Sequence, residues 1–213
     1  MNQKSLIRIG IDFDNTIICY NSAFYNAAIK KKLIPLDIPA NKNQIRNFLR
    51  QNGQENDWIQ LQGDVYGECI LDATLFPGFI DFVNFCENLN ISLFIVSHKT
   101  IHPYSGGKAN LHDAAKRWMV HKGFFDKTKI SIEPSNVYFE LTKADKIERI
   151  KALRCSYFID DLPEFLLENA FPNTTQRILF DPSNQHLTTE NSIKKMTSWE
   201  NIRIFFSEQL NFI

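Results

Sequence analysis

The chain has 213 residues, of which 44% are hydrophobic and 23% are charged, with 24 basic and 24 acidic side chains. Its formal net charge of zero argues against a protein held to nucleic acid by bulk electrostatics, although a local basic pocket remains possible. No apolar run approaches the length of a membrane-spanning helix, and no signal-peptide core stands at the N-terminus. We therefore expect a cytoplasmic protein with one core domain and a smaller insertion, and no nucleic-acid or membrane partner.

The four cysteines show no pattern of a disulfide framework or a zinc site. Cys19, Cys69, Cys86 and Cys155 lie far apart in the sequence, and none forms a Cys-x-x-Cys pair. Cysteines of this kind are usually reduced, and they usually pack as small apolar side chains. We expect four free thiols, most of them buried.

The first apolar run, Ile7–Ile11, reads as a buried strand that ends abruptly at two carboxylates, Asp12 and Asp14. Alternate residues of a strand point the same way, so these two side chains can face one site. Neighbouring carboxylates repel each other, and the pair therefore predicts a bound cation or a shared proton. The alternative is structural, because the sequence Asp14-Asn15-Thr16 also suits a turn or a helix cap.

Residues 17–76 break the alternation of strands and helices. Helical patterns cover 22–32 and 43–51, and no convincing strand is present. A simple connection between parallel strands needs far fewer residues. We expect a small helical cap over 17–76, placed above the tip of the first strand, and a core domain built from 1–16 and 77–213. A longer, merely structural excursion is the alternative.

The rest of the chain alternates strands with amphipathic helices. Apolar runs predict strands at 91–96, 137–140, 157–159 and 177–180, and helical periodicity covers 79–89, 111–121, 144–153 and 198–210. This order predicts an α/β fold with a doubly wound, mainly parallel, Rossmann-like sheet. Ligands of such sheets bind at the carboxyl ends of the strands, where Ser97, Asp160 and Asp161 join Asp12 and Asp14.

These motifs together resemble the haloacid dehalogenase (HAD) superfamily, in its magnesium-dependent phosphatase branch. The match consists of Asp12-Phe13-Asp14-Asn15-Thr16, Ser97 at the end of a strand, Lys143 at the start of a helix, and Asp160-Asp161 at the end of another strand. Their order fits across essentially the whole core, and residues 17–76 fit the helical cap that many members carry between the first and second motifs.

The resemblance implies a role for each matching residue in an aspartyl-phosphate mechanism. Asp12 is expected to be the nucleophile and a Mg²⁺ ligand, and Asp14 the general acid and base, with its carbonyl on the metal. Asp160 is expected to bind the metal, and Asp161 directly or through water. Ser97 is expected to bind a phosphoryl oxygen and Lys143 to neutralise charge at Asp12.

Several residues of this region keep an alternative interpretation. Lys146 competes with Lys143 for the site and is otherwise a solvated residue of the same helix. Thr16, His98 and Lys99 are candidate substrate contacts, although a polar surface loop would contain the same residue types at 98 and 99.

The expected function is a phosphomonoesterase for a small phosphorylated metabolite, either a nucleotide or a sugar phosphate. The alternatives are a phosphomutase or phosphotransferase of the same superfamily, and a catalytically silent small-molecule binding module. A phosphatase for proteins or polynucleotide ends is a further possibility, which the sixty-residue insertion disfavours. The sequence indicates neither the substrate nor the oligomeric state.

Overall fold

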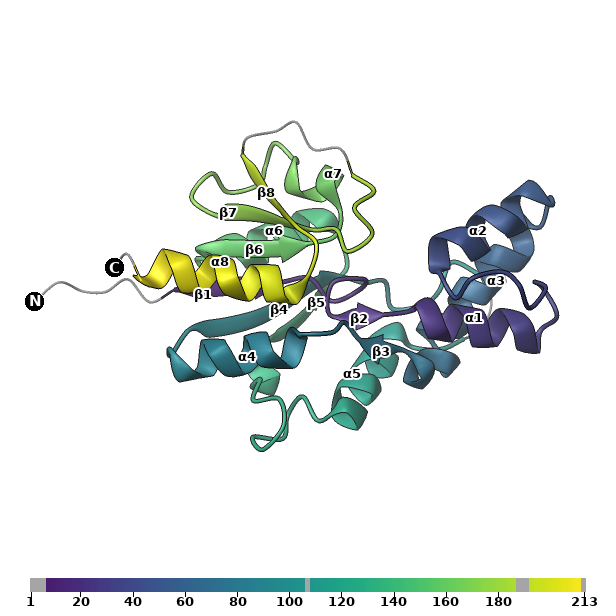
Figure 1. Ribbon diagram of the computed structural model, residues 1–213, viewed down its shortest axis with the longest axis horizontal. Coiled ribbons are helices and arrows are strands. Elements are labelled where there is room, and N and C mark those ends of the chain that lie inside the picture. The colour runs from purple at the N-terminus through teal and green to yellow at the C-terminus, as the bar shows by residue number, and fades with distance from the viewer. Residues whose placement is uncertain (1–6, 106–107, 187–191, 212–213) are drawn as a thin grey trace, which may run out of the picture. The chain divides into compact units, whose positions relative to one another are not determined.

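A computed structural model describes residues 7–105, 108–186 and 192–211 of the chain (Figure 1). Contacts between residues divide it into two compact units. The sheet unit comprises residues 1–17, 76–98 and 124–213, and the helical unit comprises residues 18–75 and 99–123. Residues 99–123, which we expected in the core domain, belong to the helical unit by these contacts.

The sheet unit is built on a six-stranded sheet in the order β5-β4-β1-β6-β7-β8, with every neighbouring pair parallel (Figure 1). This arrangement confirms the predicted α/β fold. Strands buried on both faces consist of continuous apolar residues, which is why the four inner strands are visible as apolar runs, and the edge strand β5 is a further short apolar run. The strands are β1 (Arg8–Ile11), β4 (Ser92–His98), β5 (Val137–Glu140), β6 (Tyr157–Asp160), β7 (Gln176–Phe180) and β8 (Ile193–Met196).

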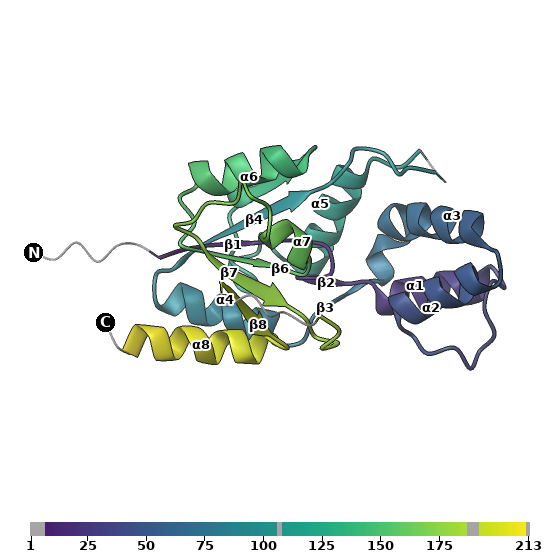
Figure 2. The same ribbon diagram turned by 90° about the horizontal axis from the view of Figure 1, so that it is seen from above.

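Helices cover both faces of this sheet, with α6 and α7 on one side and α4 and α8 on the other (Figure 2). On the first side, Ile147 and Ile150 of α6 and Phe165 of α7 belong to one buried cluster with strand residues. On the second side, Trp199 packs against Phe82 with ring centroids 5.1 Å apart. The helices are α4 (Phe79–Asn88), α6 (Lys143–Ala152), α7 (Pro163–Leu166) and α8 (Trp199–Asn211), with a 3-10 turn η2 at Pro134–Asn136.

The connectivity of the sheet determines where a ligand can bind. From β1 in the middle, the chain adds β4 and β5 on one side and then returns to place β6 on the other side of β1. The direction of winding therefore reverses between β1 and β6. Open α/β sheets bind ligands at such a reversal, outside the carboxyl ends of the strands.

The helical unit packs its helices around an aromatic core. Phe24 stacks on Trp58 with ring centroids 5.0 Å apart, and Tyr66 meets Phe24 edge-on at 5.8 Å. The Trp118 indole nitrogen donates to the Ala73 carbonyl at 3.0 Å, which fixes α5 to this unit. The elements are α1 (Asn21–Lys30), α2 (Lys42–Gln51), α3 (Glu55–Tyr66), η1 (Glu68–Asp72), α5 (Leu111–Lys122), β2 (Ile18–Cys19) and β3 (Thr74–Leu75).

The expectation that 17–76 contains no strand is wrong. Ile18–Cys19 and Thr74–Leu75 pair as a two-stranded antiparallel sheet at the two ends of this segment. Each strand is only two residues long, too short to show a period in the sequence. No helix in the parts of the chain that the structure describes is both long and apolar enough to cross a membrane.

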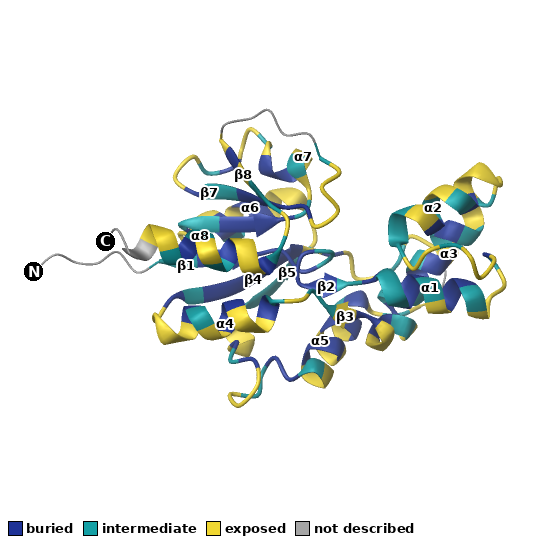
Figure 3. Cartoon of the chain, in the orientation of Figure 1, coloured by how far each residue is buried: buried dark blue, intermediate teal, exposed yellow. Residues whose placement is uncertain are grey.

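Figure 3 shows that buried residues fill the inner strands of the sheet, and Gly10 of β1 lies among them. A Cβ atom added at Gly10 would lie 2.5 Å from Cδ2 of Phe158 and 3.1 Å from Sγ of Cys155. We expect Gly10→Ala to lower the free energy of unfolding by about 1–3 kcal/mol, because a packed core cannot absorb the added methyl group. Urea unfolding measures this change. Phe158→Leu in the same chain should restore part of the loss, and an unchanged stability of Gly10→Ala alone would contradict the packing.

The four cysteines are free, with Cys86 and Cys155 buried and Cys19 and Cys69 half-buried. Burial raises the pKa of Cys155 to about 11 and raises the pKa of Cys86 further. Thiol reagents attack the thiolate, so we expect these two thiols to stay unlabelled in the folded protein at neutral pH. Mass spectrometry after brief labelling should find modification at Cys19 and Cys69 only, and at all four after unfolding. Rapid labelling of Cys86 would show that the core opens.

Candidate active site

The site forms at the reversal of winding, where β1 and β6 end side by side. Asp12 directly follows β1, and its backbone N–H donates to the Ile159 carbonyl of β6 at 2.8 Å. Asp160 is the last residue of β6. Both carboxylates are buried, with 5% of Asp12 and none of Asp160 exposed. Two acids therefore lie together at the predicted edge of the sheet, where burial makes an unpaired charge costly.

Lys146 of α6 compensates both carboxylates. Its Nζ lies 2.6 Å from Oδ1 of Asp12 and 2.6 Å from Oδ2 of Asp160, and the side chain is only 3% exposed. The ammonium group also lies 4.2 Å from the centroid of the Phe165 ring, so an aromatic face covers part of the ion pair. One cation thus bridges the two acids in a place that bulk water hardly reaches.

The contact with Asp12 that we predicted for Lys143 is made by Lys146. The interpretation of Lys146 as a solvated residue is wrong. Side chains of an α-helix lean toward its N-terminus. A lysine one turn inside α6 can therefore reach back to the strand tips, whereas Lys143, the first residue of the helix, is exposed.

A cavity of about 170 Å³ opens above these residues. Its lining comes from the ends of β1, β4 and β6, from the first turn of α6 and from α7, and it includes the predicted residues Asp14, Ser97, His98, Lys143 and Asp161. The full lining is Asp12, Asp14, Asn15, Ser97, His98, Lys143, Lys146, Asp161, Leu162 and Phe165. Motifs as far apart in the sequence as Asp12 and Asp161 therefore line one small cavity.

Ser97 contributes a buried hydroxyl group to the cavity wall. The residue is 1% exposed, and among the described residues its Oγ has no hydrogen-bond partner. A buried hydroxyl without a partner is costly, so its place on the cavity wall suits an oxygen-rich ligand. Oγ1 of Thr16 is also buried without a partner in that part of the chain, but Thr16 is absent from the cavity lining, and its carbonyl accepts from the Trp199 indole at 3.1 Å.

The acidic residues of the site offer a suitable set of ligands for a hard cation. One carboxylate oxygen each of Asp12, Asp160 and Asp161 lies within 4.8 Å of the others. Oδ1 of Asp160 accepts from the backbone N–H of Leu162 at 2.9 Å, which orients this carboxylate. Carboxylate oxygens are what Mg²⁺ prefers, and the three residues fit such an ion.

The raised pKa of Asp12 also indicates that a cation would stabilise this site. Burial, followed by the charges of Asp160 and Asp14, raises the pKa of Asp12 to about 7, although Lys146 opposes the shift. The pKa of Lys146 is raised because the attraction of Asp12 and Asp160 outweighs the effect of burial. A second positive charge near these acids would keep Asp12 ionised at neutral pH.

The two candidate residues after Ser97 differ in their surroundings. Nε2 of His98 lies 3.1 Å from the Leu141 carbonyl, in the turn that leads into α6. Lys99 belongs to the helical unit, where it is buried, with its Nζ 5.6 Å from the Tyr66 ring centroid. The Lys99 carbonyl lies 2.7 Å from Nε2 of His112 of α5. The loop interpretation of 98–99 is therefore wrong for His98, which ends β4.

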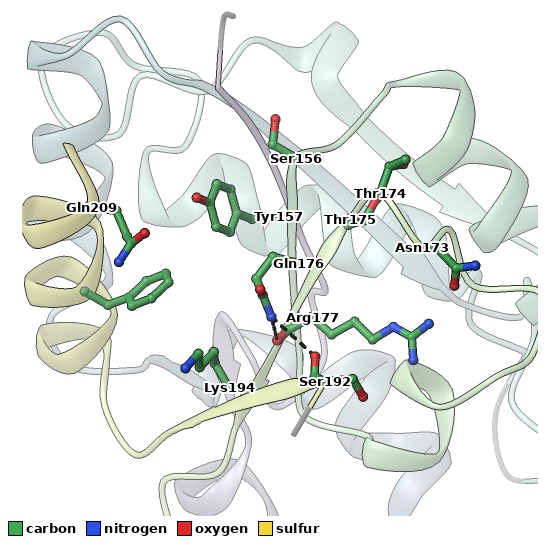
Figure 4. Close-up of a pocket in the computed structure, with 11 residues that line it drawn as sticks. Ser156, Tyr157, Asn173, Thr174, Thr175, Gln176, Arg177, Ser192, Lys194 and Gln209 are labelled. Atoms are coloured by element: carbon green, nitrogen blue, oxygen red, sulfur yellow. Dashed lines mark hydrogen bonds between the residues drawn. The ribbon is translucent and has the colours of Figure 1, made fainter. Parts of the chain in front are cut away.

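A larger cavity, of about 900 Å³, lies at the opposite ends of β6, β7 and β8 (Figure 4). Its lining includes Tyr157, Arg177 and Lys194 but no carboxylate, and it therefore has no ligand set for Mg²⁺. Side chains alternate across a strand, so Arg177 and Lys194, whose register partners are Ile193 and Ile178, point to opposite faces of the sheet. This cavity is larger than the one at Asp12, but only the smaller cavity has carboxylates that could hold a metal.

Comparisons with known proteins give a consistent picture of the fold. No family model matches the chain. A curated protein of Bacillus cereus named "Putative nucleotidase" is 24% identical over 206 residues, which cover 91% of this chain and 94% of that protein. The identity is modest, but the alignment runs through both units.

Solved structures extend the comparison to the arrangement of the chain. A HAD-superfamily hydrolase from Ehrlichia chaffeensis superposes with a TM-score of 0.54 at 16% identity, covering 95% of this chain and 97% of that one. The "putative HAD-hydrolase YfnB" of Bacillus subtilis, bound to magnesium, gives 0.58 at 14% identity, with 93% and 97% covered. A HAD family hydrolase of Deinococcus radiodurans, with bound phosphate and sodium, gives 0.56 at 10% identity, with 94% and 95% covered.

Proposed function

We propose that this chain, which has the fold of the haloacid dehalogenase superfamily hydrolases, is a Mg²⁺-dependent phosphomonoesterase. One observation carries the proposal: Lys146 bridges Asp12 and Asp160 at 2.6 Å each, with Asp161 close enough to complete a metal site. A nucleophilic carboxylate can attack a phosphate dianion only where positive charge offsets their repulsion. Asp12 and Asp160, bridged by Lys146 at the reversal of winding, have this positive charge beside them.

The reaction is proposed to proceed in two displacements at phosphorus. A carboxylate oxygen of Asp12 forms a bond to phosphorus as the ester P–O bond breaks, and Asp14 gives its proton to the departing oxygen. Asp14 then takes a proton from water, whose oxygen attacks phosphorus and releases the Asp12 carboxylate and inorganic phosphate. When bound by Asp12, Asp160, Asp161 and the Asp14 carbonyl, Mg²⁺ would supply charge neutralisation for both displacements.

Two further side chains stabilise charge on the phosphoryl group in this proposal. The Ser97 hydroxyl, which is buried and has no partner among the described residues, donates to a phosphoryl oxygen. Lys146 lowers the pKa of Asp12 against the effect of burial, and it holds the carboxylate in one orientation. Such fixed donors and charges account for most of the catalysis in phosphoryl transfer.

The proposed substrate is a small phosphorylated metabolite. The cavity volume of about 170 Å³ is below that of a typical drug-sized pocket, so it suits the phosphoryl end of a substrate, with the rest of the molecule outside it. A nucleoside monophosphate and a sugar phosphate are both proposed substrates. The name of the Bacillus cereus relative favours the nucleotide.

Phosphate release from a panel of nucleoside monophosphates, sugar phosphates, phosphopeptides and phosphate-ended oligonucleotides tests this function. We expect turnover of small substrates in Mg²⁺ and none in excess chelator. A folded protein that binds Mg²⁺ but releases phosphate from none of them would contradict the proposal. Release only from peptides or oligonucleotides would refute the proposed substrate class.

A further inference from the structure

Asp14 belongs to a tight turn that directly follows β1. The Ile17 backbone N–H donates to the Phe13 carbonyl at 3.1 Å, which closes the turn over residues 13–17. Inside the turn, Asn15 has a φ of 57°, in the left-handed region that asparagine tolerates better than most residues. The conformation of this turn sets where Asp14 reaches the cavity that it lines.

A residue from the last helix holds one carbonyl of this turn. Nε1 of Trp199, the first residue of α8, donates to the Thr16 carbonyl at 3.1 Å. Both residues are fully buried, so the bond is shielded from competition with bulk water. The bond joins positions 183 residues apart in the sequence and acts two residues after Asp14.

The indole of Trp199 is itself held firmly in the core. Three phenylalanine rings surround it, with centroids 5.0, 5.1 and 5.4 Å from that of the indole, those of Phe79, Phe82 and Phe180. The main chain also comes close, since a Cβ atom added at Gly78 would lie 3.2 Å from Cβ of Trp199. A donor packed in this way can turn only if α4 and β7 move with it.

The hydroxyl group of Thr16 does not hold the turn in place of the indole. A threonine in a turn often bonds to the nearby main chain through its hydroxyl. Here Oγ1 of Thr16 is buried and has no hydrogen-bond partner among the residues that the structure describes. The hold on the Thr16 carbonyl therefore comes from α8 and not from the threonine side chain.

We infer that Trp199 is a positioning residue for Asp14: its indole N–H fixes the Thr16 carbonyl, and through it the turn that places Asp14 at the cavity. This inference rests on the proposed function, in which Asp14 gives a proton to the departing oxygen. A general acid must lie within hydrogen-bond reach of that oxygen, so a loosened turn impairs proton transfer. The alternative is a bond that stabilises the core and nothing more.

An isosteric replacement of Trp199 tests the inference. Benzothienylalanine has sulfur in place of the indole N–H in a ring of nearly the same shape, so it removes the donor and keeps the packing. Trp199→Phe is the second variant. The matched control makes the same two replacements at Trp118, whose buried indole donates to the Ala73 carbonyl at 3.0 Å. Each site loses one hydrogen bond, but Trp118 does not hold the turn of Asp14.

Hydrogen exchange of the Ile17 amide measures the turn directly. The reference is the Asp12 amide, which donates to the Ile159 carbonyl at 2.8 Å outside the turn. Loss of the indole bond should speed exchange at Ile17 by about tenfold relative to Asp12, because a local opening exposes the turn alone. The Trp118 variants should leave this ratio unchanged. An unchanged ratio in both Trp199 variants would overturn the inference.

The dependence of turnover on the leaving group separates positioning from stability. 4-Nitrophenolate leaves phosphorus without a proton, whereas the phenolate of phenyl phosphate benefits from a general acid. The ratio of kcat/KM for 4-nitrophenyl phosphate to that for phenyl phosphate should rise by about 10²-fold in Asp14→Asn and by about tenfold in the Trp199 variants. It should stay at the wild-type value in the Trp118 variants. Equal losses on both substrates in the Trp199 variants would mean a structural role alone and overturn the inference.

The two readouts distinguish failure of this inference from failure of the proposed function, since hydrogen exchange needs no turnover. If Ile17 exchanges faster but no substrate releases phosphate, the phosphatase proposal fails and the hold of Trp199 on the turn stands. If phosphate is released but neither Trp199 variant alters Ile17, the phosphatase proposal stands and the inference falls. Should the enzyme reject aryl phosphates, acetyl phosphate and ethyl phosphate replace them, because acetate also leaves without a proton.

Discussion

Replacing Asp12 by asparagine is expected to lower kcat for phosphate release by at least about 10⁴-fold, the scale on which loss of a nucleophile acts. The amide keeps the size of the side chain and an oxygen that can accept from Lys146, but it cannot form the covalent intermediate. The variant should stay folded, because Lys146 still pairs with Asp160 and the repulsion between two buried carboxylates is removed. Steady-state phosphate release and circular dichroism measure the two quantities.

The control for this variant is Asp81→Asn. Asp81 is an exposed residue of α4, and its replacement should leave both activity and stability close to those of wild type. A folded Asp12→Asn that retains more than about a hundredth of the wild-type turnover would show that Asp12 is not the nucleophile. Trapping the phosphorylated protein with labelled substrate gives an independent readout, since only wild type should carry the label.

The sequence predicts the sheet best where burial is most complete. Buried parallel strands such as β4 and β6 are continuous apolar runs, so they stand out without any neighbour. The edge strand β8 is different: its sequence Ile-Lys-Lys-Met is half polar, and Lys194 is exposed. These polar residues hide the pattern that identifies a strand, whereas the other edge strand, β5, keeps three apolar residues in a row.

The assignment of α5 could not be predicted from periodicity. The apolar face of this helix, with Trp118 and Met119, was visible in the sequence, but an apolar face does not indicate which element it packs against. The bond from Trp118 to the Ala73 carbonyl spans 45 residues and depends on the fold of the helical unit. Long-range contacts of this kind follow from three-dimensional packing, which a helical period does not encode.

Most of the site residues could be predicted from the ends of strands, and the site lysine is the exception. Asp12, Ser97 and Asp160 could be predicted because each lies at the end of a recognisable strand or next to it. Strand ends do not decide between Lys143 and Lys146. Each lysine lies four residues before a buried isoleucine of α6, so the helical period places both near the sheet. The lean of side chains toward the helix N-terminus favours the lysine one turn further along, a signal available in the sequence.

Replacing Lys146 by methionine is expected to damage both stability and catalysis. The ammonium group is buried and bridges two buried carboxylates, so its removal leaves those charges without their cation. Breaking a buried ion pair from one side typically costs about 3–5 kcal/mol, and we expect a loss of that size in chelator. Excess Mg²⁺ should restore part of it, because the ion would neutralise the same acids. Urea unfolding with and without Mg²⁺ measures both effects.

The matched variant is Lys143→Met, which makes the same chemical change in an exposed residue three positions away. It should change the free energy of unfolding by no more than about 0.5 kcal/mol, in chelator or in Mg²⁺. In Lys146→Met we also expect kcat to fall by at least about 10²-fold at saturating Mg²⁺, since the ion replaces the lost charge but not the hydrogen bond that orients Asp12. Equal stability of the two variants in chelator would contradict the bridge between Asp12 and Asp160. Full recovery of kcat by Mg²⁺ would mean that the lysine serves stability alone.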